Sequence, residues 1–159
     1  MTYKVAVLTI SDKCSKEERE DKSGKIVMEL LKKHPFEVIK YQVIPDEPSM
    51  IKERLVYYCD NLKVSLVLTT GGTGFTPRDF TPEATREVIE REVPGIPEAM
   101  RVECLKFSPR AMLSRSIAGI RGRTLIVNLP GSSKGAKESF EVILGVLAHG
   151  LDMIAGEEH

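Results

Sequence analysis

The sequence predicts an α/β domain with a largely parallel central sheet. Short aliphatic runs alternate with longer amphipathic stretches along the chain, a pattern typical of successive βα units. Three of the runs are almost continuous in Val, Leu and Ile, as strands are when helices cover both faces of their sheet. A chain of 159 residues can bury one ordinary core and is short for two, so we expect a single domain over residues 1–159.

The individual elements follow from where each pattern starts and stops. Residues 5–10, 64–70 and 124–129 are the aliphatic runs and are expected as central strands. Apolar residues recur at helical spacing between Ala136 and Leu151, so one face of that helix should pack on the sheet. In chain order we expect strand 4–10, helix 26–33, strand 38–44, helix 51–62, strand 64–70, helix 83–92, helix 98–107, strand 124–129 and helix 136–151.

Composition argues against several classes of protein. Lys plus Arg equals Asp plus Glu at 23 each, so no overall charge attracts nucleic acid or an anionic membrane, and any anion site must be local. No segment approaches the roughly 20 apolar residues of a membrane helix, and the N-terminus resembles a strand rather than a signal peptide. Cys14, Cys59 and Cys104 lack the spacing of a disulfide framework or a zinc site. We therefore expect a soluble, cytoplasmic protein.

The strand at residues 64–70 runs into a glycine-rich loop, Gly71-Gly72-Thr73-Gly74. Adjacent glycines expose backbone N–H groups, which can form a concave site for phosphate oxygens. The loop lacks the lysine of a Walker A motif, and Pro77 stands where a dinucleotide fingerprint needs its third glycine. A phosphate-binding loop and a plain tight turn both remain possible explanations.

Polar segments follow all three aliphatic runs. Ser11-Asp12 follows the first run, the glycine loop follows the second, and residues 130–134 follow the third. Ligands of open α/β sheets bind outside the carboxyl ends of the strands. We therefore expect these three segments to line one crevice.

Two aspartates are candidate metal ligands at this crevice. Asp79 ends the glycine-loop region, and we expect Thr81 to cap the next helix, which leaves Asp79 free for other work. Asp46 follows another strand, where its alternative role is to cap a helix, in competition with Ser49. Two carboxylates facing a phosphate-binding loop are an arrangement that suits Mg²⁺ when it also holds substrate phosphates. The pattern indicates phosphoryl or nucleotidyl transfer.

Several motifs resemble the MogA/MoaB family of molybdenum-cofactor biosynthesis. The loop residues 71–74 are followed by Thr76-Pro77-Arg78-Asp79 and then by Thr81-Pro82-Glu83-Ala84, as in that family. The resemblance covers nearly the whole chain. It implies a three-layer α/β/α sandwich with a mostly parallel central sheet, and it implies a homotrimer. The other matching segments are Ser11-Asp12, Ile44-Pro45-Asp46-Glu47, Pro94-Gly95, Ala111-Met112-Leu113-Ser114-Arg115 and Asn128-Leu129-Pro130-Gly131-Ser132.

The resemblance also implies an activity and a set of site residues. The activity is Mg²⁺-dependent transfer of AMP from ATP to the phosphate of molybdopterin, with release of pyrophosphate and transfer of the product to a downstream molybdenum insertase. Asp46 and Asp79 match the two important aspartates of the family, with catalytic and metal-binding roles. The implied substrate-binding residues are Ser11, Asp12, Gly71, Gly72, Thr73, Gly74, Thr76, Ser114, Asn128, Pro130, Gly131 and Ser132.

Some alternatives stay open at this point. Arg78, Arg115 and Lys134 are candidate charge partners for substrate phosphates, and a solvated surface role is the competing explanation for each. Cys104 occupies a position where some relatives carry a small polar residue, and we expect it to be a buried core thiol. The competing functions are molybdopterin binding without catalysis, as in part of the MoaB branch, and a scaffold role.

Overall fold

One mixed sheet forms the centre of the protein. The computed structural model describes residues 2–157, and within that range six strands have the order β2-β1-β3-β6-β5-β4. The first four strands of this order are parallel, β5 pairs antiparallel with β6, and β4 pairs antiparallel with β5 at the edge. The strands are β1 (Tyr3–Ile10), β2 (Phe36–Ile44), β3 (Leu66–Thr70), β4 (Arg91–Glu92), β5 (Ala118–Arg121) and β6 (Thr124–Leu129). The predicted mostly parallel sheet is confirmed.

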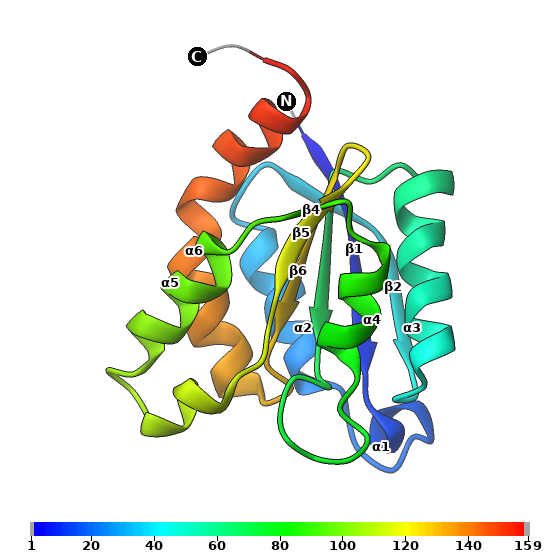
Figure 1. Cartoon of the computed structure of the whole chain (residues 1–159), viewed down its shortest axis with the longest axis vertical. Helices are drawn as coiled ribbons and strands as arrows, with labels where there is room; N and C mark the ends of the chain where they lie inside the picture. The colour runs from blue at the N-terminus through cyan, green and yellow to red at the C-terminus, as the bar shows by residue number, and fades with distance from the viewer. Residues whose placement is uncertain (1, 158–159) are drawn as a thin grey trace.

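Helices cover both faces of this sheet. Figure 1 shows α2, α5 and α6 over one face and α3 and α4 over the other. The core divides accordingly, because Val5, Val7 and Leu68 pack with one group of helices, while Ala6 and Leu8 pack with the other. The helices are α1 (Asp12–Ser15), α2 (Lys22–Leu31), α3 (Pro48–Val56), α4 (Thr81–Val88), α5 (Gly95–Cys104) and α6 (Ser133–Ile154), with a π-helix η1 (Tyr57–Asn61) and a 3₁₀-helix η2 (Pro109–Leu113).

The three aliphatic runs are the central strands, as predicted. β1, β3 and β6 lie side by side, and every residue of β3 and β6 is buried. The long helix α6 packs the predicted apolar face on the sheet, with Phe140, Ile143 and Leu147 in the core. None of the helices within residues 2–157 is both long enough and apolar enough to span a bilayer.

The antiparallel edge was not predicted. The expected helix 83–92 ends at Val88, and Glu90 and Val93 instead donate backbone hydrogen bonds to β5, at 2.8 and 2.9 Å. Gly119 permits this pairing, because a Cβ there would lie 2.5 Å from the side chain of Ile89. The next helix starts at Gly95 rather than 98, since a proline such as Pro97 is tolerated in the first turn.

The parallel strands end at one edge of the sheet, at the lower end of Figure 1. β1 has β2 on one side and β3 on the other, so the chain changes direction across the sheet at this point. In open α/β sheets the ligand crevice lies at such a switch point. We therefore expect the segments that follow β1, β2, β3 and β6 to form the ligand-binding site.

Candidate active site

The glycine loop after β3 is a tight turn that faces two cavities. Gly71 and Gly72 have φ of +98° and +69°, in the left-handed region that favours glycine. A Cβ at Gly71 would overlap the backbone carbonyl of Ile10, so the loop passes directly over the end of β1. Both glycines are therefore needed for the turn itself. Gly71 N donates to the carbonyl of Leu129 at 3.1 Å, so the backbone that a ligand can reach begins at Gly72.

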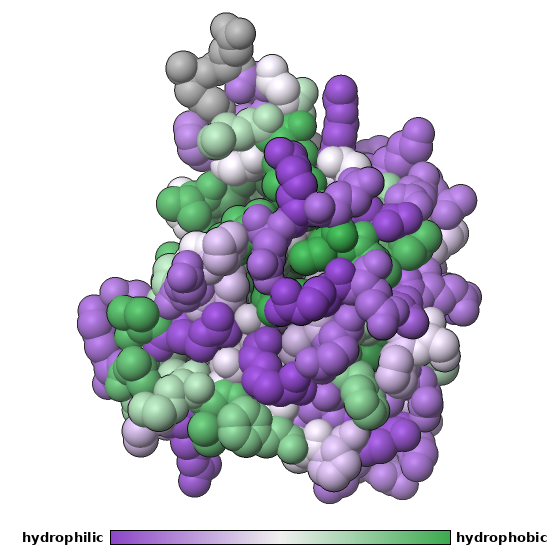
Figure 2. Space-filling model, viewed as in Figure 1, coloured by the Kyte–Doolittle hydropathy of each residue, from purple (hydrophilic) through white to green (hydrophobic). Residues whose placement is uncertain are grey.

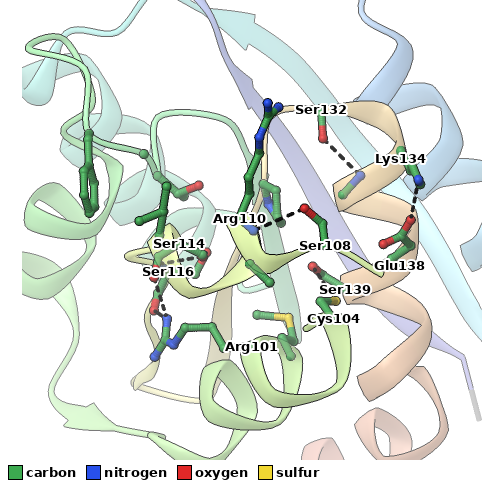
Figure 3. A pocket seen from close by; sticks show the side chains of 18 residues that line it. Arg101, Cys104, Ser108, Arg110, Ser114, Ser116, Ser132, Lys134, Glu138 and Ser139 are labelled. Carbon is green, nitrogen blue, oxygen red and sulfur yellow. Dashed lines mark hydrogen bonds and ion pairs between the residues drawn. The ribbon is translucent and has the colours of Figure 1, made fainter. Parts of the chain in front are cut away.

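The first cavity, which we name the α5–α6 cavity, has a volume of about 530 Å³. Figure 3 shows it between helices α5 and α6, the 3₁₀-helix η2 and the glycine loop. Met100, Cys104 and Leu113 give it apolar and sulfur-containing walls. Cys104 is buried, as predicted, and its Sγ lies 3.6 Å from Ser139 Oγ on α6. Apolar walls with a few polar groups are typical of a pocket for a small organic ligand.

The charged groups of the α5–α6 cavity are mainly cationic. Arg101 donates from Nη1 to the carbonyls of Ser114 and Ser116, at 3.2 and 2.9 Å. Lys134 Nζ lies 3.8 Å from Glu138. Arg110 extends from η2 toward Ser132 (Figure 3), and within residues 2–157 its guanidinium has no hydrogen bond or ion pair. The cavity therefore favours an anionic ligand.

The second cavity, which we name the β1–β3 cavity, has a volume of about 460 Å³ and is lined mainly by polar residues. Asp46 and Asp79 line it. A buried network lies along its wall, in which Asp21 accepts hydrogen bonds from Thr9 Oγ1 at 2.7 Å, from Gly24 N at 3.0 Å and from Tyr41 OH. The N-termini of α2 and α6 also open into it, and such termini attract anions. The cavity therefore suits a ligand rich in phosphate and hydroxyl groups.

Asp46 is held by a reciprocal pair of hydrogen bonds with Asp12. Asp46 Oδ2 accepts from Asp12 N, and Asp46 N donates to Asp12 Oδ1, both at 2.9 Å. The N-cap of α3 is Glu47, with no side-chain capping bond, so the helix-cap explanation for Asp46 is wrong. Asp46 is only 8% exposed, and this burial is the main cause that raises its pKa, with the charges of Asp12 and Asp79 adding to it.

Asp79 is likewise free of helix capping. The N-cap of α4 is Phe80, without a side-chain capping bond, and Thr81 is the first residue of the helix. The expectation that Thr81 caps this helix is therefore wrong, although Asp79 is left free as predicted. Asp79 Oδ2 accepts from Thr76 N at 3.0 Å, which fixes its carboxylate within the loop.

Gly72 packs closely against Thr81 Oγ1, beside Asp46. This hydroxyl is buried and, among residues 2–157, has no hydrogen-bond partner. A Cβ at Gly72 would overlap it and would lie 3.2 Å from Asp46 Oδ1. The absence of a side chain at Gly72 therefore lets the loop approach Thr81 and Asp46 closely. The buried Thr81 hydroxyl stays unpaired within the described residues, which costs about 1–3 kcal/mol.

The donor set in this region fits Mg²⁺ rather than a metal held by protein alone. Within the described part of the chain, no group of three or more His, Cys, Asp or Glu residues is arranged to hold an ion. Mg²⁺ is commonly bound through one or two carboxylates together with substrate phosphates and water. Asp46 and Asp79 supply two such carboxylates on the wall of one cavity.

Comparison with known proteins places these features in a family. Residues 6–149 match the family model described as a probable molybdopterin binding domain. The chain belongs to this family. It is 41% identical over 157 residues to molybdopterin adenylyltransferase of Helicobacter pylori strain J99, covering 98% of this chain and 89% of the relative.

Solved structures of this molybdopterin-binding family share the fold. The MoaB enzyme of Thermus thermophilus has a TM-score of 0.94 and 52% identity, with 98% of both chains covered. The tungsten-cofactor synthesising MoaB of Pyrococcus furiosus has a TM-score of 0.85 and 35% identity, covering 96% of this chain and 97% of that one. The expected fold class is confirmed.

Most of the predicted site residues of this family member lie on the two cavities. In the loop between β6 and α6, Pro130 faces the α5–α6 cavity, Gly131 faces the β1–β3 cavity, and Ser132 lines both. Thr73, Gly74, Ser114 and Pro130 line the α5–α6 cavity, and Ser11, Asp46, Gly71, Gly72, Asp79 and Gly131 line the β1–β3 cavity.

Three predicted residues line neither cavity. Thr76 is exposed on the loop, and the Asp12 carboxylate is occupied by Asp46 N and Arg78. Asn128 is fully buried, where its amide accepts from Ile117 N and donates to the hydroxyls of Thr69 and Thr85. These contacts give Asn128 a structural role, in which its side chain links β6 to β3 and α4.

The predicted charge partners are only partly available. Arg115 donates to the carbonyls of Gly74 and Asp79 and to Glu83, so it holds the loop in place. Lys134 does line a cavity, as do Arg101 and Arg110, which sequence reasoning missed. Asp21 was also missed, although Asp three residues before Gly24 is a recognisable N-cap pattern.

Proposed function

We propose that this chain is a molybdopterin adenylyltransferase, which transfers AMP from ATP to the phosphate of molybdopterin and releases pyrophosphate. The observation that carries the proposal is the meeting of two chemically different cavities at Ser132, with Asp46 and Asp79 on one of them. Near-full-length similarity to enzymes of that name, at 41% identity, supports it.

The two cavities divide the substrates between them. The α5–α6 cavity has the apolar walls and cationic rim that suit a pterin bearing a phosphate. The β1–β3 cavity has the hydroxyls, helix N-termini and carboxylates that suit a nucleotide triphosphate. The pterin phosphate and the α-phosphorus of ATP then meet near the glycine loop and Ser132.

The reaction needs positioning and charge neutralisation more than proton transfer. An oxygen of the pterin phosphate attacks the α-phosphorus of ATP, and the bond from that phosphorus to the bridging oxygen of pyrophosphate breaks. A phosphate monoester carries a charge of about −1.5 to −2 at pH 7, so it needs no general base to become a nucleophile. Mutual repulsion of two anions is the main obstacle, and fixed donors with well-aligned reactants reduce it.

The residues divide this work. Asp46 and Asp79 hold Mg²⁺, which when bound neutralises charge on the triphosphate. Backbone N–H groups of Gly72–Gly74 and Gly131–Ser132 orient the phosphates, whereas Gly71 N already donates to the carbonyl of Leu129 at 3.1 Å. Arg110 and Lys134, which line the α5–α6 cavity, attract the pterin phosphate.

A homotrimer in the cytoplasm, delivering its product to a downstream molybdenum insertase, completes the proposal. Figure 2 shows apolar side chains gathered at the lower end of the molecule. Phe75, which follows the glycine loop, and Met112 and Leu113 of η2 are exposed, and exposed apolar side chains support self-association. Light scattering coupled to gel filtration tests the trimer, and a monomeric mass at micromolar concentration would exclude it.

The decisive experiment is an incubation with molybdopterin, ATP and Mg²⁺, followed by analysis of products. An adenylylated pterin and pyrophosphate in equal amounts are expected. Pterin binding with no product would favour the alternative, a molybdopterin-binding protein without catalysis.

A further inference from the structure

Arg78 joins three loops at the carboxyl end of the sheet. Its Nε and Nη2 donate to Asp12 Oδ2 and Oδ1, both at 3.0 Å, and Nη2 also donates to Glu47 Oε1 at 2.9 Å. Asp12 follows β1, Glu47 follows β2, and Arg78 belongs to the loop after β3. One guanidinium thus fixes segments that are far apart in the sequence.

These contacts surround the two candidate metal ligands. Asp12 exchanges two backbone-to-carboxylate hydrogen bonds with Asp46, and Glu47 is the next residue after Asp46. Asp79 is the next residue after Arg78. The guanidinium is therefore linked to Asp46 from two sides and to Asp79 through one peptide unit.

We propose that Arg78 and Asp12 form a positioning pair that sets the separation of Asp46 and Asp79. This inference rests on the proposed function, in which those two carboxylates hold Mg²⁺. It revises the expected roles of both residues, because neither lines a cavity and their polar atoms are engaged with each other. Arg78 acts on the metal site through the loops and contacts no substrate.

The contribution of Arg78 to folding is small. Its side chain is 51% exposed, and exposed ion pairs typically contribute only about 0.2–1 kcal/mol to stability. Substitution of Arg78 therefore leaves a folded protein. Residues that orient metal ligands, by contrast, commonly change metal affinity or activity by about 10- to 100-fold when they are replaced.

Lysine cannot replace arginine in this arrangement. The planar guanidinium contacts both oxygens of Asp12 and still reaches Glu47, whereas an ammonium is a single point charge on a flexible stem. Arg78→Lys consequently keeps the charge near the site but loses the geometry. The Arg78→Lys variant therefore distinguishes the effect of loop positioning from the effect of a positive charge near the metal site.

The test compares Arg78→Lys with a matched control, Arg86→Lys. Arg86 forms a similar exposed ion pair with Glu92, at 2.8 Å, and lines neither cavity. Mn²⁺ binding is measured by water-proton relaxation, with and without ATP and in the absence of pterin. We expect Arg78→Lys to weaken Mn²⁺ binding by about 10- to 100-fold, with a similar fall in kcat and an unchanged KM for molybdopterin. Arg86→Lys should match the wild type.

A second variant tests the coupling. Asp12→Asn removes the charge that Arg78 binds, so it should produce a similar loss, and the double variant should be no worse than the more affected single variant. Wild-type Mn²⁺ binding by Arg78→Lys would overturn the inference, as would additive losses in the double variant. If the wild type binds Mn²⁺ but forms no adenylylated pterin, the proposed function fails while the relaxation measurement still decides the role of Arg78.

Discussion

Replacing Gly72 by alanine tests the close packing of this glycine against Thr81 and Asp46. The substitution adds one methyl group at a position where φ is +69°. That methyl would approach Thr81 Oγ1 more closely than the 3.0 Å that real Cβ atoms respect, and it would lie 3.2 Å from Asp46 Oδ1. Gly122→Ala is the matched control, because Gly122 also has positive φ, at +59°, and nothing lies within 4 Å of its Cβ position.

The two variants should differ by the cost of the collision. Left-handed backbone costs an alanine about 1–2 kcal/mol, which is the whole expected loss for Gly122→Ala. In a domain of this size that corresponds to a fall in Tm of roughly 2–8 °C. Gly72→Ala adds overpacking of about 1–3 kcal/mol, for a total of about 2–5 kcal/mol, which an ordinary domain survives.

Activity separates the variants further. Gly122 is remote from both cavities, so Gly122→Ala should retain full AMP transfer at a temperature well below its Tm. The methyl of Gly72→Ala must push Thr81, Asp46 or the loop aside, and misplacement of about 1 Å in an active site can reduce the rate about 100-fold. Calorimetry and the AMP-transfer assay measure the two effects. Retention by Gly72→Ala of more than about a tenth of the Gly122→Ala activity would refute this view of the site.

The other predictions concern three charged residues. Asp79→Asn should reduce Mg²⁺-dependent AMP transfer at least about tenfold while pterin binding persists, and near-normal transfer would exclude a metal-positioning role. The raised pKa of Asp46 means that the folded protein binds its proton more tightly than the unfolded chain, so ionised Asp46 lowers stability at neutral pH and protonation relieves this. Asp46→Asn should therefore raise Tm at pH 7, by a margin that shrinks on acidification toward about pH 4, and a lowered Tm at pH 7 would contradict the argument. Arg110→Ala should weaken molybdopterin binding about fivefold at low salt and less at high salt, whereas Lys106→Ala, outside both cavities, should not; equal effects would remove Arg110 from the site.

The central strands and the convergence of Asp46 and Asp79 could be predicted for simple physical reasons. Strands covered on both faces must be aliphatic throughout, and parallel strands bring their following loops to one edge of the sheet. The short antiparallel edge could not be predicted. Strands of two and four residues carry too little periodicity to be recognised, and β4 depends on the absence of a side chain at Gly119.

Side-chain direction accounts for the rest of the mismatch. Arg101 and Arg110 belong to a helix and a 3₁₀-helix, and only the packing of those elements aims them at a cavity. Asn128 lies on a predicted central strand, but the sequence does not show that Ile117 N and the hydroxyls of Thr69 and Thr85 all bind its amide.

The position of Ser132 has a consequence for what happens after the reaction. This residue lines both cavities, so an adenylylated pterin would occupy the two of them together across the Pro130–Ser132 segment. Two joined moieties bind more tightly than either alone, because the second binds at the high effective concentration that the linkage imposes. The product would then dissociate more slowly than either substrate. Product release would limit turnover, and an acceptor protein that takes the product directly from the site would raise the turnover rate.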